Sequence, residues 1–162
     1  MSKRAEAIAD RIDQGTEAMA GFVEGLSEAE WHTVVPNEER TVAALVRHTA
    51  DSFPFFIQWA SALAEGQPIT GVTWDDIAGM NAQHGQAHAV ANKQETIELL
   101  RTNSKIAADK VRQFTDEELD NVATVCLYWD TPLSAQWLIE YHHIRHSYHH
   151  LDSIRAALNG SA

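Results

Sequence analysis

The chain contains a single cysteine, Cys126, among its 162 residues. One thiol cannot form a disulfide within the chain, and it cannot supply the several thiolates of a cysteine-rich zinc site. Any bound metal would therefore depend on histidine, aspartate and glutamate. Because no activating partner for Cys126 can be identified from the sequence, we expect this residue to be a small buried hydrophobic side chain.

Basic residues and long hydrophobic runs are also scarce. Twelve Lys and Arg stand against 23 Asp and Glu, which gives a formal net charge of -11. That excess repels nucleic acid and anionic lipid, and no local basic patch counters it. No stretch approaches the roughly 18 apolar residues of a membrane span, and the first residues lack a signal-peptide core. We therefore expect a cytoplasmic protein that binds neither nucleic acid nor a membrane.

Few breaks interrupt the chain, which has only four prolines and eight glycines. No repeat and no low-complexity linker divides it. Hydrophobic residues make up 44% of the sequence, enough for one full core at this length. These features predict a single domain that spans residues 1–162.

Apolar residues recur at helical intervals along most of the chain, and no strand pairs are convincing. Four main helices are predicted, over residues 5–25, 41–65, 74–114 and from 131 onward. The third region is either one long, imperfect helix or a short helix followed by a longer one. Thr131 and Pro132 are expected to provide the N-cap and first-turn proline of the last helix. The predicted fold class is all-α.

Histidine is concentrated near the C-terminus, where residues 141–150 hold five of the nine in the chain. Hydrophobic residues run through the same segment at helical intervals, so it is not a purification tag. His142 and His146 are four residues apart, and so are His146 and His150. Either pair could direct both imidazoles to one metal ion, because residues one turn apart share a helix face. Spacing alone does not choose between the pairs.

A third ligand would have to come from another helix, and His48 is the best candidate. It lies in the apolar stripe of the second predicted helix, near Leu45 and Phe55. Three neutral imidazoles leave coordination positions open, as catalytic metal sites require. A single histidine on an apolar face, however, is more often part of the core. His84 and His88 are also four apart, but the default interpretation places them on the solvated surface.

The last predicted helix is apolar on two faces. The histidines continue one stripe, and a second stripe lies on roughly the opposite side, formed by Trp137, Tyr141, Ile144, Tyr148, Leu151 and Leu158. Only one face of a helix can meet the core of a four-helix bundle. We interpret the second stripe as the interface of a homodimer.

Three segments resemble motifs of the DinB-like superfamily, also described as YfiT-like metal-dependent hydrolases. Residues 41–51 match the apolar stretch that leads to a metal-binding histidine, residues 74–81 resemble the opening of the third helix, and residues 146–154 match the last-helix pattern His-x-x-His-His. The family's Gly-Gln after this pattern is Asp152-Ser153 here. The resemblance covers essentially the whole chain and implies an antiparallel four-helix bundle.

By this resemblance, the metal ligands are His48, His146 and His150, and the ion is divalent, most often zinc or nickel. His142 and His149 would then lie around the ligands. His143 would sit at the edge without an assigned role.

The resemblance also implies homodimers and a small-molecule substrate. Some relatives use a low-molecular-weight thiol, so we expect a metal-dependent thiol transferase or hydrolase in which the ion activates a thiol or a water. No catalytic acid or base can be named from the sequence. The alternative is a dimeric bundle that binds a metal or a small ligand without turnover.

Overall fold

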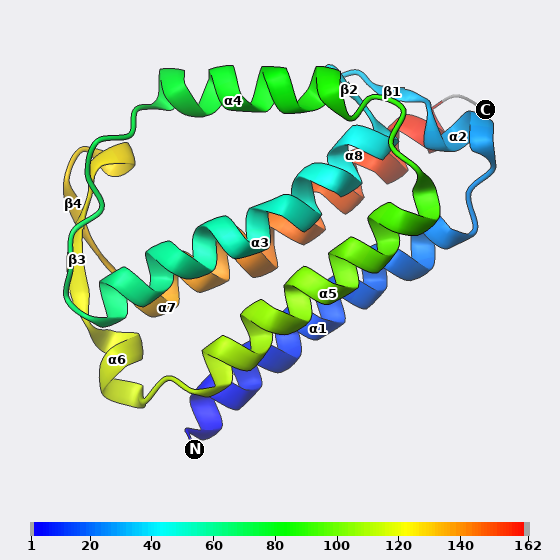
Figure 1. Cartoon of the computed structure of the whole chain (residues 1–162). Helices are drawn as coiled ribbons and strands as arrows, with labels where there is room; N and C mark the ends of the chain where they lie inside the picture. The colour runs from blue at the N-terminus through cyan, green and yellow to red at the C-terminus, as the bar shows by residue number, and fades with distance from the viewer. Residues whose placement is uncertain (1, 161–162) are drawn as a thin grey trace.

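Four long helical segments form a bundle in the computed structural model, which describes residues 2–160 (Figure 1). They are α1 (Lys3–Glu24), α3 (Val42–Ala64), α5 (Lys93–Arg112) and a C-terminal segment made of α7 (Ala135–Ile139), the π-helical turn η2 (Glu140–Arg145) and α8 (His146–Asn159). In Figure 1, α1 and the C-terminal segment run in one direction, and α3 and α5 run in the other. The predicted all-α four-helix bundle is confirmed. None of the described helices is long and apolar enough to cross a membrane.

The adjacent helices α3 and α5 run parallel because α4 (Trp74–Ala87) carries the chain back along the bundle. Figure 1 shows α4 lying above α3, apart from the four packed helices. Thr73 caps α4 in a capping box with Asp76, and Asn92 caps α5. Region 74–114 is therefore a short helix followed by a longer one, the second of the two predicted alternatives.

Two small antiparallel sheets contradict the prediction that strand pairs are absent. β1 (Val34–Val35) pairs with β2 (Arg40–Thr41), and β3 (Val122–Val125) pairs with β4 (Thr131–Ser134). Between β3 and β4, the 3-10 turn η1 (Cys126–Tyr128) is followed by Trp129 and Asp130 at φ angles of 55° and 53°, which help reverse the chain. Thr131 and Pro132 therefore belong to β4 and do not start the last helix as predicted. That helix starts later, with Ser134 as its N-cap.

Two short helices, α2 (Glu28–Trp31) and α6 (Asp116–Asp120), lie between the longer elements. Each begins at a capping box, Ser27 with Glu30 and Thr115 with Glu118, in which two backbone N–H groups find partners. These local signals could be read from the sequence because they need no distant contact.

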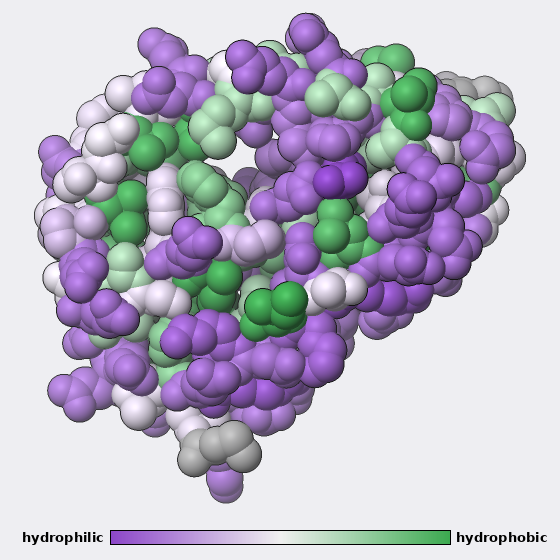
Figure 2. All heavy atoms as spheres, in the orientation of Figure 1, coloured by the Kyte–Doolittle hydropathy of each residue, from purple (hydrophilic) through white to green (hydrophobic). Residues whose placement is uncertain are grey.

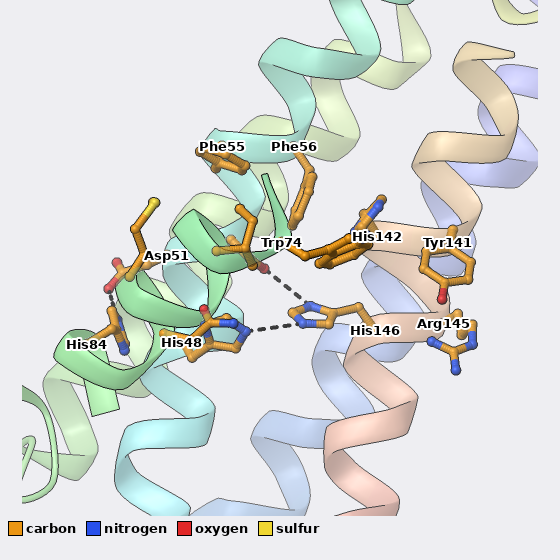
Figure 3. A pocket seen from close by; sticks show the side chains of 14 residues that line it. His48, Asp51, Phe55, Phe56, Trp74, His84, Tyr141, His142, Arg145 and His146 are labelled. Carbon is orange, nitrogen blue, oxygen red and sulfur yellow. Dashed lines mark hydrogen bonds and ion pairs between the residues drawn. The ribbon is translucent and has the colours of Figure 1, made fainter. Parts of the chain in front are cut away.

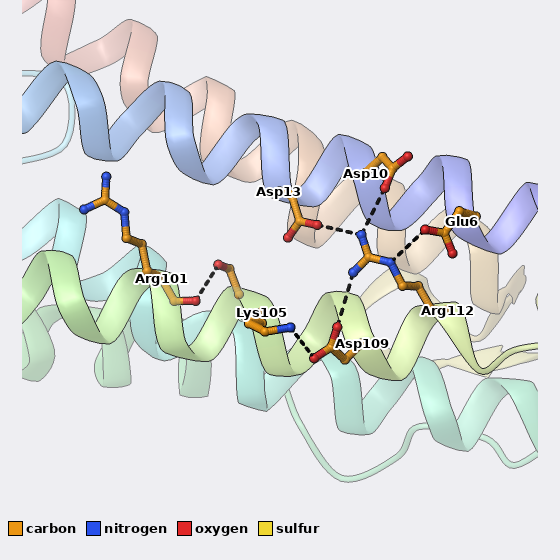
Figure 4. A network of polar contacts seen from close by, with 8 residues as sticks. Glu6, Asp10, Asp13, Arg101, Lys105, Asp109 and Arg112 are labelled. Atoms are coloured by element: carbon orange, nitrogen blue, oxygen red, sulfur yellow. Dashed lines mark hydrogen bonds and ion pairs between the residues drawn. The ribbon is translucent and has the colours of Figure 1, made fainter.

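Ion pairs join α1 to α5 along their outer edge (Figure 4). Arg112 contacts Glu6, Asp10 and Asp13 of α1, and Arg101 contacts Glu17 at 2.9 Å. Each exposed pair contributes only about 0–1 kcal/mol. Their collective effect is to offset the repulsion between acidic side chains that share this face of α1.

The second apolar stripe of the last helix mostly packs inside the chain. Ile144 and Leu151 are buried, and Tyr148 lies against Gly15 of α1, where an added Cβ would come within 3.3 Å of the tyrosine ring. The interpretation of this stripe as a dimer interface is therefore wrong for Ile144 and Leu151, because α1 lies on this side of the C-terminal segment. The homodimer itself stays a prediction.

Helix α3 continues through Pro54, which has no N–H to donate to the Ala50 carbonyl. The side chain of Asn103 in α5 replaces that donor: its Nδ2 donates to the Ala50 carbonyl oxygen at 3.0 Å. The hydrogen bond satisfies a backbone group that proline leaves unpaired, and it fixes α3 against α5.

We expect Asn103→Ala to lower the free energy of unfolding by about 1–2 kcal/mol, because the Ala50 carbonyl then lacks a partner. In a Pro54→Ala background the same substitution should cost less, since the N–H of residue 54 can restore the helical bond. Urea unfolding of the four proteins of this double-mutant cycle measures the difference. Equal costs in the two backgrounds would contradict this role of Asn103.

Candidate metal centre

The structure brings His48, His146 and His150 together between α3 and α8. His146 Nε2 lies 3.2 Å from His48 Nε2 (Figure 3). It also lies 2.9 Å from His150 Nε2. Two ligands about 2.0 Å from a tetrahedral zinc ion would lie roughly 3.3 Å apart. Three imidazole nitrogens that face one another also need a shared proton or cation, because neutral acceptors repel. Both the spacing and the donor set fit a divalent ion.

A carboxylate orients one of these imidazoles. His150 Nδ1 lies 3.0 Å from Glu38 Oε1, and the other carboxylate oxygen accepts a 2.8 Å hydrogen bond from Arg40. With its proton on Nδ1, His150 presents the Nε2 lone pair to the other histidines. The hydrogen bond with His150 lowers the pKa of Glu38 to about 2, so this carboxylate stays ionised.

Burial keeps the three imidazoles neutral. It lowers the pKa of His48 to about 3 and lowers the pKa of His146 well below its ordinary value. The pKa of His150 is also lowered by burial, although Glu38 opposes the shift. Neutral imidazoles are the form that binds metal, so these side chains need not release protons at neutral pH.

His142 is held apart from the three converging nitrogens. Its ring stacks on Phe56 with centroids 3.8 Å apart, and its Nε2 lies 2.9 Å from the hydroxyl oxygen of Tyr128. Of the two possible pairs, the structure thus places His146 and His150, rather than His142 and His146, beside His48. His142 lines the adjoining cavity, whereas His149 is exposed and lies 3.6 Å from Glu38.

The expectation for His143 was wrong. This side chain is only 1% exposed, and its ring lies 5.4 Å from that of Phe53. Within residues 2–160, neither ring nitrogen makes a hydrogen bond of ordinary geometry, and burial lowers the pKa to about 3. The π-helical turn η2 explains the error: it changes the angular spacing between residues 140 and 145, so a regular helix misplaces the histidines within it.

His84 and His88 were also misplaced by the default surface interpretation. His84 Nε2 lies 2.9 Å from Asp51 Oδ2, and the His88 ring is centred 4.4 Å from that of His84. Burial raises the pKa of Asp51, but hydrogen bonds from His84 and Arg47 outweigh it and hold the pKa below its usual value. The four-residue spacing of the two histidines was the signal in the sequence.

A cavity of about 310 Å³ adjoins the histidines, between α3, α4 and the C-terminal segment. Figure 2 shows the hollow beneath α4. His48 and His146 form part of the wall, and the rest is mainly apolar, with Phe55, Phe56, Trp74, Ile77 and Met80. A small molecule in this cavity would lie directly against His48 and His146, two of the three converging imidazoles.

Arg145 is a cation at the edge of this cavity. Its guanidinium lies 4.7 Å from the centroid of the Tyr141 ring. Within the described part of the chain, the other seven arginines each form an ion pair with a carboxylate, and Arg145 forms none, although acidic residues outnumber basic ones.

Fold and site together define a helical bundle with a candidate three-histidine metal centre. The chain belongs to the DinB superfamily, whose family model matches residues 11–154.

Two solved structures share this fold. YfiT from Bacillus subtilis, described as a probable metal-dependent hydrolase with an unusual four-helix bundle topology, aligns with 99% of this chain and 90% of its own at a TM-score of 0.77 and 18% identity. An uncharacterised protein from Clostridium difficile 630 aligns over 96% of both chains, with a TM-score of 0.74 and 14% identity. No curated protein sequence matches the chain.

We expect His48→Ala, His146→Ala and His150→Ala each to weaken Zn²⁺ binding by more than about 100-fold, because each would remove one of the three predicted ligands. Glu38→Gln should weaken it by about 10–100-fold, because it removes the charge that orients His150. Competition with a chromophoric chelator, using untagged protein, measures these affinities.

The matched control is His32→Ala, since His32 is exposed and its Nδ1 lies 2.8 Å from a carbonyl oxygen of its own helix. Equal losses of affinity in all five variants would show that the three histidines are not the ligands.

His143 should also make the metal-free protein less stable in acid. Its pKa is about 3 in the folded state and about 6.5 when unfolded, so the unfolded chain binds a proton first as the pH falls. Stability from this group is complete above pH 6.5 and declines as the pH falls toward 3. When the pH is lowered from 7 to 5, the free energy of unfolding should therefore fall by about 2 kcal/mol more in the parent than in His143→Leu.

Urea unfolding at the two pH values tests this, with His32→Leu as the exposed control. Parallel pH profiles for the parent and His143→Leu would refute the assignment.

Proposed function

We propose that this protein is a metal-dependent enzyme that acts on a small molecule bound in the cavity. His48, His146 and His150 would hold one divalent ion, zinc or nickel. The observation that supports this most directly is the convergence of their three Nε2 atoms, with His48 and His146 at the cavity wall. When bound, such an ion supplies an open coordination position and lowers the pKa of a water or thiol there, which yields a nucleophile at neutral pH.

The chain's own residues prepare this site. Glu38 keeps the His150 proton on Nδ1, so that Nε2 faces the ion. Phe55 and Phe56 surround the reacting region with apolar surface, which limits competing water and strengthens electrostatic interactions.

Thiol transfer and hydrolysis share this activation step. The resemblance to thiol-using relatives supports transfer, and the description of YfiT as a probable metal-dependent hydrolase supports hydrolysis. Cys126 is not the source of a thiol at the site, because its Sγ donates to the carbonyl of Val72 at 3.1 Å and it does not line the cavity. A low-molecular-weight thiol would therefore have to enter as a second substrate.

Arg145 favours a substrate that carries a negative charge. An anionic group could pair with this guanidinium while the apolar part of the molecule lies against the aromatic walls. The apolar cavity also suits the alternative, a bundle that binds a metal or a small ligand without turnover. Homodimerisation is a further proposal, supported by the family resemblance alone.

The metal-loaded, untagged protein should convert electrophiles or esters, alone or with added cysteine or glutathione. Activity should disappear after chelation and in His150→Ala, and it should return when Zn²⁺ or Ni²⁺ is restored to the parent. Product formation across a panel of matched acidic and neutral substrates measures it. Tight metal binding with no turnover across the panel would instead support the non-catalytic alternative.

Within the same panel, Arg145→Gln should raise KM for acidic substrates and leave KM for their neutral counterparts unchanged. Arg155→Gln is the matched control, because Arg155 lies on the same helical segment and also packs over an aromatic ring, that of Phe22.

A further inference from the structure

A second group of metal-binding side chains lies beside the three histidines. Asp51 of α3, His84 of α4 and His88 at the end of α4 each place a ligand atom within 4.8 Å of the others. The closest approach is 2.9 Å, between His84 Nε2 and Asp51 Oδ2 (Figure 3). All three side chains are partly buried, so the group is neither a surface acidic cluster nor part of the core.

The two groups are built in the same way. Each combines two histidines four residues apart on one helix, His146 with His150 and His84 with His88, with one residue of α3. The α3 residues, His48 and Asp51, are three apart and so lie on adjoining parts of one helix face. Two imidazoles and one carboxylate form a donor set that suits iron, zinc and related divalent ions.

One atom in this second group lacks a partner. His84 Nδ1 is buried and makes no hydrogen bond within residues 2–160, while Nε2 of the same ring faces Asp51. A buried nitrogen without a partner costs free energy, so an arrangement in which both ring nitrogens are satisfied is favoured. A bound cation would satisfy such a nitrogen.

Arg47 competes for the same carboxylate, since its Nε donates to Asp51 Oδ2 at 2.8 Å. The contacts of Arg47 and His84 both use Oδ2, so Oδ1 is the carboxylate oxygen that could bind a metal without displacing Arg47. The Arg47 side chain is also 31% exposed, and it can move into water at little cost.

We propose that Asp51, His84 and His88 form a second divalent-metal site that faces the same cavity as the first. The His84 ring is centred 5.7 Å from that of His48, and Asp51, His84 and His48 all line the cavity. A cation here would bind an anionic group of a substrate whose reacting atom lies at the first site. The protein would then present two metal ions to one small molecule, which goes beyond the single-ion function proposed above.

Metal stoichiometry tests this directly. Untagged, full-length protein is stripped with a chelator and titrated with Co²⁺ and, separately, with Zn²⁺, and bound metal is counted by equilibrium dialysis and elemental analysis. The parent should bind two equivalents. His88→Gln and Asp51→Asn should each lose one equivalent or bind it at least 10-fold more weakly, and His150→Ala should lose the other.

The matched controls are His32→Gln and Asp152→Asn, exposed residues outside both groups, which should keep two equivalents. Circular dichroism confirms the helix content of each variant, and His88 lies at a helix end where glutamine is tolerated. One equivalent in the parent at saturation, or two in both His88→Gln and Asp51→Asn, would overturn the proposal. Loss of the second metal equivalent in His149→Gln would also overturn the proposal, because that result would assign the second ion to Glu38 and His149. Loss of binding in His150→Ala tests the first site separately.

Discussion

The hydrogen bond between Glu38 and His150 connects the parts of the molecule on which the candidate centre depends. Glu38 lies in the turn between β1 and β2, whereas His150 lies one turn into α8. The contact therefore fixes the hairpin against the last helix and sets which nitrogen of His150 faces His48 and His146. A single partly buried carboxylate links the local geometry of a turn to the candidate metal centre. Arg40 pairs with the same carboxylate and compensates its negative charge.

Much of the fold could be predicted because its signals are local. The capping boxes at Ser27, Thr73 and Thr115 each start a helix, because the side chains three residues apart satisfy backbone N–H groups of the first turn. These contacts do not depend on distant parts of the chain. Thr131 and Pro132 carried an equally clear helix-start signal, yet they form a strand. The competing partner, β3, comes from an earlier segment and provides backbone hydrogen bonds that a helical first turn cannot. A short stretch of sequence around Thr131 does not include β3, so it cannot show that strand pairing is favoured over a helix there.

The same distinction applies to the site. The four-residue spacing of His146 and His150 could be read directly, and a resemblance selected that pair together with His48. His142 was expected beside the ligands and does line the cavity. The burial of His143 was not predicted, since it lies in the π-helical turn, where an angle of 100° per residue no longer applies. Glu38 was missed because its contact with His150 spans 112 residues. His84 and His88 carried the correct spacing, but only the packing of α4 against α3 shows that Asp51 completes their group.

Helix α4 is the least integrated of the longer helices. Gly85 is its one buried residue within the described part of the chain, and Trp74 and Met80 remain about half exposed although they line the cavity. An apolar molecule in the cavity would cover surface that α4 leaves open to water, and would supply packing that the sequence does not provide. The occupant would then serve as a removable part of the hydrophobic core, and its binding would stabilise the fold in proportion to how far its concentration exceeds its dissociation constant.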